Sequence, residues 1–206
     1  MAEPVVWQAS KDECGRAGAV LARAFISEAL VIACYPAPMP DLELLTQRFS
    51  ASLRYACRVG QVWAIGTAKA DIAGVAMVYQ EPVEPPSPEV RIELGYPDEP
   101  TVDATIACMF QMTSPADASF DDMPTPWRNL AMLGVDPNRQ GQDLGSILLQ
   151  HILADAAAAG EPVGLFTASE RNVPFYRRAG LELCWSGVSD DGTITMWSFR
   201  TPRPTS

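Results

Sequence analysis

Between residues 129 and 167 an apolar run, a polar turn and a long amphipathic stretch follow one another, and this succession constrains the fold most. Residues 130–135 form a nearly unbroken apolar run, which is typical of a strand buried on both faces in a parallel part of a sheet. Residues 142–159 have helical spacing and stop at Gly160, and residues 163–167 predict the next buried strand. The 27 residues between the two strands are enough for a right-handed βαβ crossover.

The rest of the chain predicts antiparallel strands and further helices around this unit. Strands are predicted at residues 5–8, 62–67, 72–79, 181–187 and 193–199, the last two joined by an Asp-Gly turn at 190–192. One helix is predicted at residues 14–25. A second follows a Pro-rich turn at 35–40 and has Asp41 as its N-cap, and a short third helix is predicted around Pro174, before Gly180. We therefore predict an α/β fold in which helices flank both faces of a mixed, mostly antiparallel sheet.

Negative charge is concentrated in one segment. Residues 81–126 contain ten acidic side chains, one basic side chain and nine of the eighteen prolines, so they account for −9 of the net charge of −10. Such a segment is either a solvated insertion or an acidic lid over a cationic ligand. Residues 102–112 within it fit a helix or a strand equally well. We predict one domain over residues 1–200, with this acidic, Pro-rich insertion at 81–126 and a disordered tail at 201–206.

Composition excludes several classes of protein. The net negative charge argues against a nucleic-acid partner, which needs clustered Lys and Arg. No stretch approaches the ~18 consecutive apolar residues of a membrane span, and the N-terminus lacks a basic head followed by an apolar run, so we expect a cytoplasmic protein. The five cysteines have no CxxC spacing and His151 is the only histidine, so we predict reduced thiols and no metal site.

The turn between the predicted strand and helix, residues 135–146, has the features of an anion site. A polar, glycine-containing turn at a helix N-terminus leaves backbone N–H groups unpaired at the positive end of the helix dipole. A phosphate or diphosphate suits such a site best. The glycine spacing is neither that of a dinucleotide-binding GxGxxG motif nor that of a Walker loop.

Two motifs in this region resemble the GNAT superfamily of N-acetyltransferases. The first is LGVDP at residues 133–137 followed by Gln140-x-x-Asp143-x-Gly145, which is similar to the family pattern Gln/Arg-x-x-Gly-x-Gly/Ala. The second is NVPFYRRAG at residues 172–180, about 30 residues further on. The similarity covers residues 130–185, and the C-terminal portion looks most like the puromycin N-acetyltransferase branch.

The resemblance implies acetyl-CoA as co-substrate, without a metal, and it implies the residues that hold it. The strand edge at 133–135 would pair with the pantetheine arm and the turn would hold the diphosphate. Tyr176 would be the general acid, since a phenol with a pKa near ~10 keeps its proton at neutral pH, and Asn172 shares its helix face. The implied coenzyme site comprises Leu133, Gly134, Val135, Arg139, Gln140, Gly141, Gln142, Asp143, Leu144, Gly145, Ser146, Asn172 and Tyr176.

Two residues depart from the family pattern. Asp143 replaces a glycine and brings a negative charge near the diphosphate, which predicts weaker coenzyme binding. Asn129 stands where some relatives carry a catalytic glutamate, and an amide cannot accept a proton from an ammonium group. Glu93, Asp121 and Asp122 of the acidic segment are the candidate bases.

These observations predict an enzyme that transfers an acetyl group from acetyl-CoA to a primary amine of a small molecule, by direct attack in a ternary complex. Two alternatives remain: a non-catalytic acyl-CoA-binding module, which Asp143 and Asn129 favour, and acetylation of a peptide or protein amine. The identity of the acceptor and a homodimeric state stay open.

Overall fold

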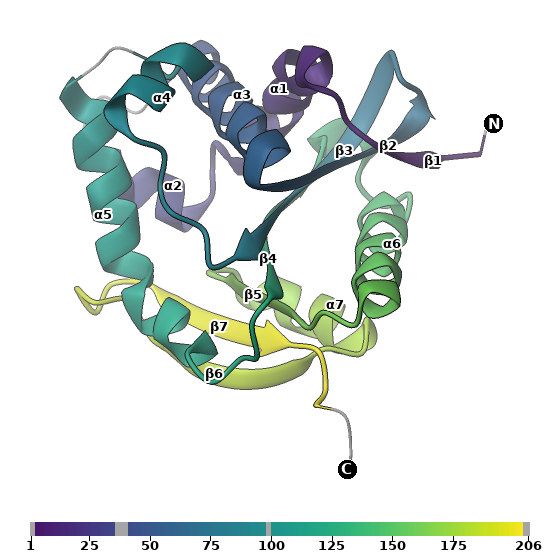
Figure 1. The fold of residues 1–206 in the computed structure, drawn as a ribbon, viewed down its shortest axis with the longest axis vertical. Coiled ribbons are helices and arrows are strands. Elements are labelled where there is room, and N and C mark those ends of the chain that lie inside the picture. The colour runs from purple at the N-terminus through teal and green to yellow at the C-terminus, as the bar shows by residue number, and fades with distance from the viewer. Residues whose placement is uncertain (1–2, 36–40, 98–99, 204–206) are drawn as a thin grey trace.

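The structure is a computed structural model that describes residues 3–35, 41–97 and 100–203 (Figure 1). Its strands are β1 (Val5–Gln8), β2 (Gly60–Ala68), β3 (Asp71–Glu81), β4 (Trp127–Val135), β5 (Val163–Thr167), β6 (Glu182–Val188) and β7 (Thr195–Arg200). Its α-helices are α1 (Cys14–Phe25), α2 (Ala29–Cys34), α3 (Leu42–Val59), α4 (Pro88–Leu94), α5 (Pro100–Asp117), α6 (Leu144–Ala159) and α7 (Val173–Arg178). Within the described residues, no helix is long and apolar enough to cross a bilayer.

The strands form one seven-stranded sheet in the order β1-β2-β3-β4-β5-β7-β6. β4 and β5 run parallel and are joined by α6, and every other neighbouring pair is antiparallel. The predicted mixed, mostly antiparallel sheet and its central βαβ crossover are therefore confirmed. The two predicted hairpins are present as β2–β3 and β6–β7.

Helices cover both faces of the sheet, because alternate residues of its strands point in opposite directions. Val62 and Ala64 of β2 belong to the core under α1 and α3, whereas Trp63 and Ile65 belong to the core under α6. Figure 1 shows α1 and α3 together on one side of β2 and β3, away from α6. The predicted two-sided arrangement is confirmed.

The predicted helix boundaries follow from their caps. Asp41 begins α3 by accepting a hydrogen bond from the backbone N–H of Leu44 at 2.7 Å, as predicted. α6 ends at Gly160, which adopts a left-handed conformation with φ 72°. The predicted Pro-rich turn lies mainly at residues 36–40, outside the described residues, and α2 just before it was not predicted.

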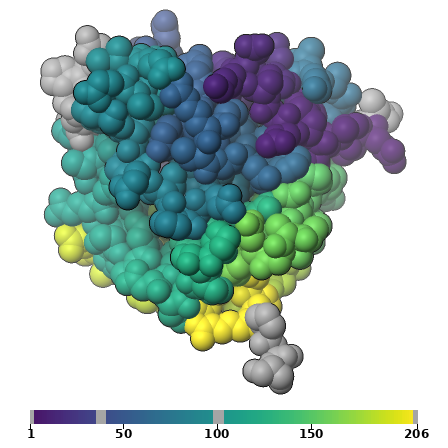
Figure 2. All heavy atoms as spheres, in the orientation of Figure 1, coloured from purple at the N-terminus to yellow at the C-terminus, as the bar shows by residue number. Residues whose placement is uncertain are grey.

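The acidic segment is largely helical. It contains α4, which Ser87 caps, and α5, which includes the stretch whose secondary structure the sequence left open. Figure 2 shows this teal segment beside the blue surface of α3 on one face of the molecule. At the start of the predicted tail, Thr201 donates its backbone N–H to the Val163 carbonyl at 2.9 Å, and residues 204–206 lie outside the described part.

β4 and β5 are paired at one end only. Arg128 lies opposite Val163 and Asn129 lies opposite Gly164, and beyond these two pairs β5 is paired only with β7. β4 continues beside β3 as far as Val135. The two parallel strands therefore separate, and an open strand edge faces the space between them.

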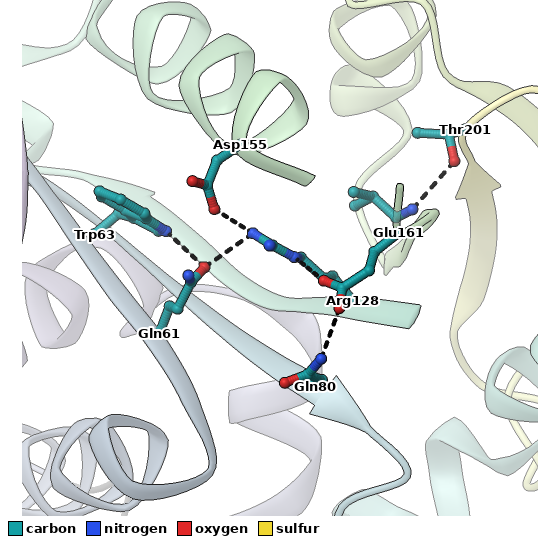
Figure 3. A network of polar contacts seen from close by, with 8 residues as sticks. Gln61, Trp63, Gln80, Arg128, Asp155, Glu161 and Thr201 are labelled. Carbon is teal, nitrogen blue, oxygen red and sulfur yellow. Dashed lines mark hydrogen bonds and ion pairs between the residues drawn. The ribbon is translucent and has the colours of Figure 1, made fainter. Parts of the chain in front are cut away.

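A buried arginine holds the closed end of this gap (Figure 3). The Arg128 side chain is 8% exposed, and its guanidinium donates to Glu161 at 2.6 Å, to Gln61 at 3.0 Å and to Asp155. Gln61 belongs to β2, Asp155 to α6, and Glu161 to the loop before β5. The network thus ties β4 to three neighbouring parts of the chain at the point where the strands begin to separate.

Candidate active site

The gap between β4 and β5 opens into a cleft of about 560 Å³. All of residues 130–135 line it, together with residues from the turn after β4, from α2 and α5, and from α7. A bulge lies at Ala131, because Met77 of β3 pairs with Met132 while the next residue, Val78, pairs with Leu130. The cleft therefore runs along an irregular strand whose outer edge has no strand partner.

The prediction that residues 130–135 are buried on both faces in a parallel part of the sheet is wrong. Ala131 is exposed and Leu133 is half-buried, and the parallel pairing stops at Asn129. The run is apolar for two other reasons. On one face α1 packs so closely that a β-carbon at Gly134 would come within 2.9 Å of the Phe25 ring. The residues of the run also form one wall of the cleft.

Asp136 anchors the turn that follows β4. Its carboxylate accepts a hydrogen bond from the backbone N–H of Asn138 at 3.0 Å and pairs with Arg23 of α1 at 2.6 Å. Burial disfavours the charge of Asp136, but the Asn138 N–H and the Arg23 guanidinium outweigh it, so the pKa of this carboxyl lies below its ordinary value. The turn is thereby held against α1.

The backbone of residues 140–146 carries unpaired donors. None of its N–H groups donates a hydrogen bond to another described residue, and the first bond of the following helix runs from Ile147 N–H to the Asp143 carbonyl at 3.0 Å. Most of these residues line the cleft. The predicted group of unpaired main-chain donors at a helix N-terminus is therefore present in the fold.

Asp143 adopts the left-handed conformation that favours glycine, with φ 57° and ψ 9°. An aspartate tolerates this conformation better than most residues, at a cost of about 1 kcal/mol. Its side chain is exposed, makes no capping hydrogen bond and lies among the residues that line the cleft. The departure from the family glycine thus keeps the backbone shape and adds a negative charge.

The structure brings the predicted coenzyme residues together around the cleft, with one exception. Gln142 does not line it, and its side-chain oxygen instead accepts a hydrogen bond from Arg139 at 3.3 Å. Arg139 also donates to Asp71 at 3.2 Å, which keeps the guanidinium beside the turn. The residues that do line the cleft are Leu133, Gly134, Val135, Arg139, Gln140, Gly141, Asp143, Leu144, Gly145, Ser146, Asn172 and Tyr176.

Tyr176 lies on α7 with 8% of its surface exposed. Its ring packs against Phe175 and Phe199, and its hydroxyl has no hydrogen-bond partner among the described residues. Burial raises the pKa of Tyr176 above its ordinary value, and the negative charge of Glu28 raises it further. The phenol is therefore protonated at neutral pH and has a proton to give.

Asn172 is the N-cap of α7 and shares the cleft with Tyr176, as their spacing predicts. Its side-chain amide donates to the Thr167 hydroxyl at the end of β5, at 3.2 Å. This bond links the start of α7 to the strand that forms the far wall of the gap.

The three candidate bases do not line the cleft. Glu93 pairs with Arg58 and Asp122 with Arg200 at 2.8 Å, and neither they nor Asp121 line the cleft. None of the described acidic side chains of the segment at 81–126 lines the cleft. Asn129 donates to Glu81 at 3.0 Å and is likewise absent from the cleft lining.

Glu28 is a site residue that the sequence analysis missed. It is the N-cap residue of α2, lines the cleft, and accepts a hydrogen bond from Arg171 at 2.9 Å. Its side chain is 23% exposed, whereas that of Arg171 is 73% exposed. The available signal was a single acidic residue between two apolar helical stretches, at the end of the first predicted helix.

Comparisons with known proteins agree with this geometry. The family model described as the acetyltransferase (GNAT) family matches residues 32–181. The chain therefore belongs to this family, whose members use acetyl-CoA as co-substrate. It is an N-acetyltransferase. The finer resemblance to the puromycin branch stays a prediction.

Solved structures with the same fold include three acetyltransferases. One, described as histone acetyltransferase HPA2 and related acetyltransferase from Corynebacterium glutamicum, is 20% identical with a TM-score of 0.71, and the match covers 100% of this chain and 99% of that one. A Drosophila melanogaster polyamine N-acetyltransferase is 15% identical with a TM-score of 0.71, over 98% and 100% of the two chains. A mosquito arylalkylamine N-acetyltransferase-like protein is 17% identical with a TM-score of 0.64, over 97% and 99%.

Proposed function

We propose that the protein transfers the acetyl group of acetyl-CoA to a primary amine of a small molecule by direct attack in a ternary complex. One observation carries this proposal: the open edge of β4, the unpaired N–H groups of residues 140–146 and the buried Tyr176 phenol all meet in one cleft. The polyamine and arylalkylamine acetyltransferases with this fold support a small amine as the acceptor.

The residues present fit the coenzyme. A diphosphate matches the main-chain donors of residues 140–146, because they lie at the positive end of α6. The amides of a pantetheine arm match the backbone groups of residues 133–135, which have no strand partner on that side. When bound, acetyl-CoA supplies the acetyl thioester.

The chain's own groups then serve the transfer. Backbone N–H groups of β4 donate to the thioester oxygen as negative charge develops on it. The amine nitrogen bonds to the thioester carbon, the carbon–sulfur bond breaks, and Tyr176 gives its proton to the departing sulfur. Glu28, which also lines the cleft, takes the proton that an ammonium group must lose before its nitrogen can attack. The second proton, which the nitrogen loses as the amide forms, restores the Tyr176 hydroxyl. Arg171 is largely exposed and can leave Glu28 when a cationic amine arrives.

The test is thiol release from acetyl-CoA with a panel of amines, in the wild type and in Tyr176→Phe. We expect Tyr176→Phe to lower kcat by about a hundredfold or more while the Kd for coenzyme A changes little, since the phenol acts on the leaving sulfur. Tyr79→Phe is the matched control, because Tyr79 is a half-buried tyrosine that does not line the cleft. Undiminished turnover in Tyr176→Phe would remove this residue from the mechanism.

The sequence left open a non-catalytic acyl-CoA-binding module, and Asp143 at the turn is the residue that still favours it, since Asn129 does not line the cleft. The same experiment separates the two functions. Coenzyme binding without thiol release for every amine, including peptide N-termini, would favour the binding module. Release with peptide amines alone would favour acetylation of peptides or proteins.

A further inference from the structure

We infer that the acceptor is a monoamine, in which a single ammonium group is joined to an apolar body, and that polyamines are poor acceptors. This inference rests on the proposed function and concerns the part of the cleft that residues of α2, α5 and β5 line, together with Phe25 and Glu28 just before α2. We call this part the acceptor arm. It is lined by Phe25, Glu28, Leu30, Val31, Met109 and Phe166.

Apolar side chains dominate the acceptor arm. Leu30 and Val31 come from α2, Met109 comes from α5, and Phe166 comes from β5. Leu30, Met109 and Phe166 are half-buried, so each presents apolar surface to the cleft. The nearby Thr113 is buried, and its hydroxyl already donates to Asp117 at 2.8 Å. An apolar acceptor body would therefore replace water against apolar walls.

Among its described residues, the acceptor arm contains one carboxylate, that of Glu28. Among the described residues that line the whole cleft, the acidic ones are Glu28 and Asp143, and Asp143 lies at the turn, at the coenzyme end. The acidic segment contributes Met109 and Thr113 to the lining, and none of its described acidic side chains. The interpretation of this segment as an acidic lid over the ligand therefore does not hold for the described acids.

One carboxylate suits one ammonium group. An amine bound at Glu28 would replace the Arg171 guanidinium, so that one cation exchanges for another and Glu28 stays paired. A second ammonium group on the same molecule would lie against Leu30, Met109 or Phe166 and would lose its water without gaining a partner. Polyamines and agmatine, which carry at least two positive charges, should therefore bind poorly.

The first experiment compares kcat/KM for 2-phenylethylamine and hexylamine with kcat/KM for putrescine, spermidine and agmatine, measured by thiol release. We expect the two monoamines to be preferred by at least tenfold. A preference for the polyamines would overturn this inference and leave the proposed function standing. Thiol release with none of the amines would refute the proposed function, and this inference with it.

The second experiment places another carboxylate in the acceptor arm with Met109→Glu, and uses Met109→Gln as the uncharged control of similar shape. We expect Met109→Glu to shift the ratio of putrescine to hexylamine turnover toward putrescine by about tenfold, and Met109→Gln to leave the ratio near that of the wild type. Equal ratios in the two variants would overturn the inference. Because each ratio is measured within one variant, a partial loss of folded protein cancels.

Discussion

Removing the charge of Asp143 should strengthen coenzyme binding. Asp143→Asn keeps the size of the side chain and its tolerance of the left-handed backbone at φ 57°, so the turn should keep its shape. What the substitution removes is a negative charge at the rim of the cleft, one residue before α6 begins. A diphosphate held by the N–H groups of residues 140–146 would be repelled by that charge.

The size of the effect follows from the exposure of Asp143. For an exposed carboxylate about 7 Å from each of two phosphate charges, Coulomb's law in water gives a repulsion of about 1.2 kcal/mol. Screening leaves about 0.9 kcal/mol at 10 mM ionic strength and about 0.5 kcal/mol at 150 mM. We therefore expect the Kd for coenzyme A to fall about fivefold at 10 mM and about twofold at 150 mM.

Calorimetric titration with coenzyme A at both ionic strengths measures this directly. Asp12→Asn is the control, because Asp12 is an exposed acid outside the cleft and its loss changes the net charge equally. An unchanged or weaker affinity in Asp143→Asn at 10 mM ionic strength would mean that the diphosphate of coenzyme A does not lie beside this turn.

Two further predictions concern the residues that shape the cleft. Arg128→Met should lower the free energy of unfolding by about 3 kcal/mol, because it leaves the carboxylates of Asp155 and Glu161 without the guanidinium. Urea denaturation measures this, and a loss below about 1 kcal/mol would contradict the network in Figure 3. The pKa of Asp136 is lower in the folded chain than its unfolded value near ~3.9. The charged Asp136 therefore stabilises the folded state above that pH, and this contribution is lost as the pH falls through the folded pKa. The difference in free energy of unfolding between the wild type and Asp136→Asn, measured by urea denaturation, should therefore be smaller at pH 3 than at pH 7. An equal difference at the two pH values would contradict this role of Asp136.

The centre of the fold was predictable because its determinants are local. The apolar run at residues 130–135, the capping Gly160 and the crossover length each specify a neighbouring element, and together they leave few arrangements of the sheet. The turn at 140–146 was predictable for the same reason, since unpaired N–H groups follow from its place between a strand and a helix.

The divergence of β4 from β5 and the role of Glu28 were not predictable in this way. The end of the parallel pairing at Asn129 has no local sequence signal, and the Arg128 network beside it joins partners 67, 27 and 33 residues away in the sequence. Glu28 enters the cleft because the short helix α2 turns back toward α5. The number of acidic residues at 81–126 suggested an acidic lid over the ligand, but a count of charges does not indicate which side chains reach a cleft.

In the proposed function, one cleft holds acetyl-CoA by the open edge of β4 and the turn after it. Hydrogen–deuterium exchange with and without saturating coenzyme A is the sharpest test, because it reports on those backbone N–H groups themselves. We expect slower exchange in peptides that cover residues 130–135 and 140–146, and unchanged exchange in the β2 region at 60–68. Unchanged exchange in both of the first two regions, with the coenzyme bound, would contradict it.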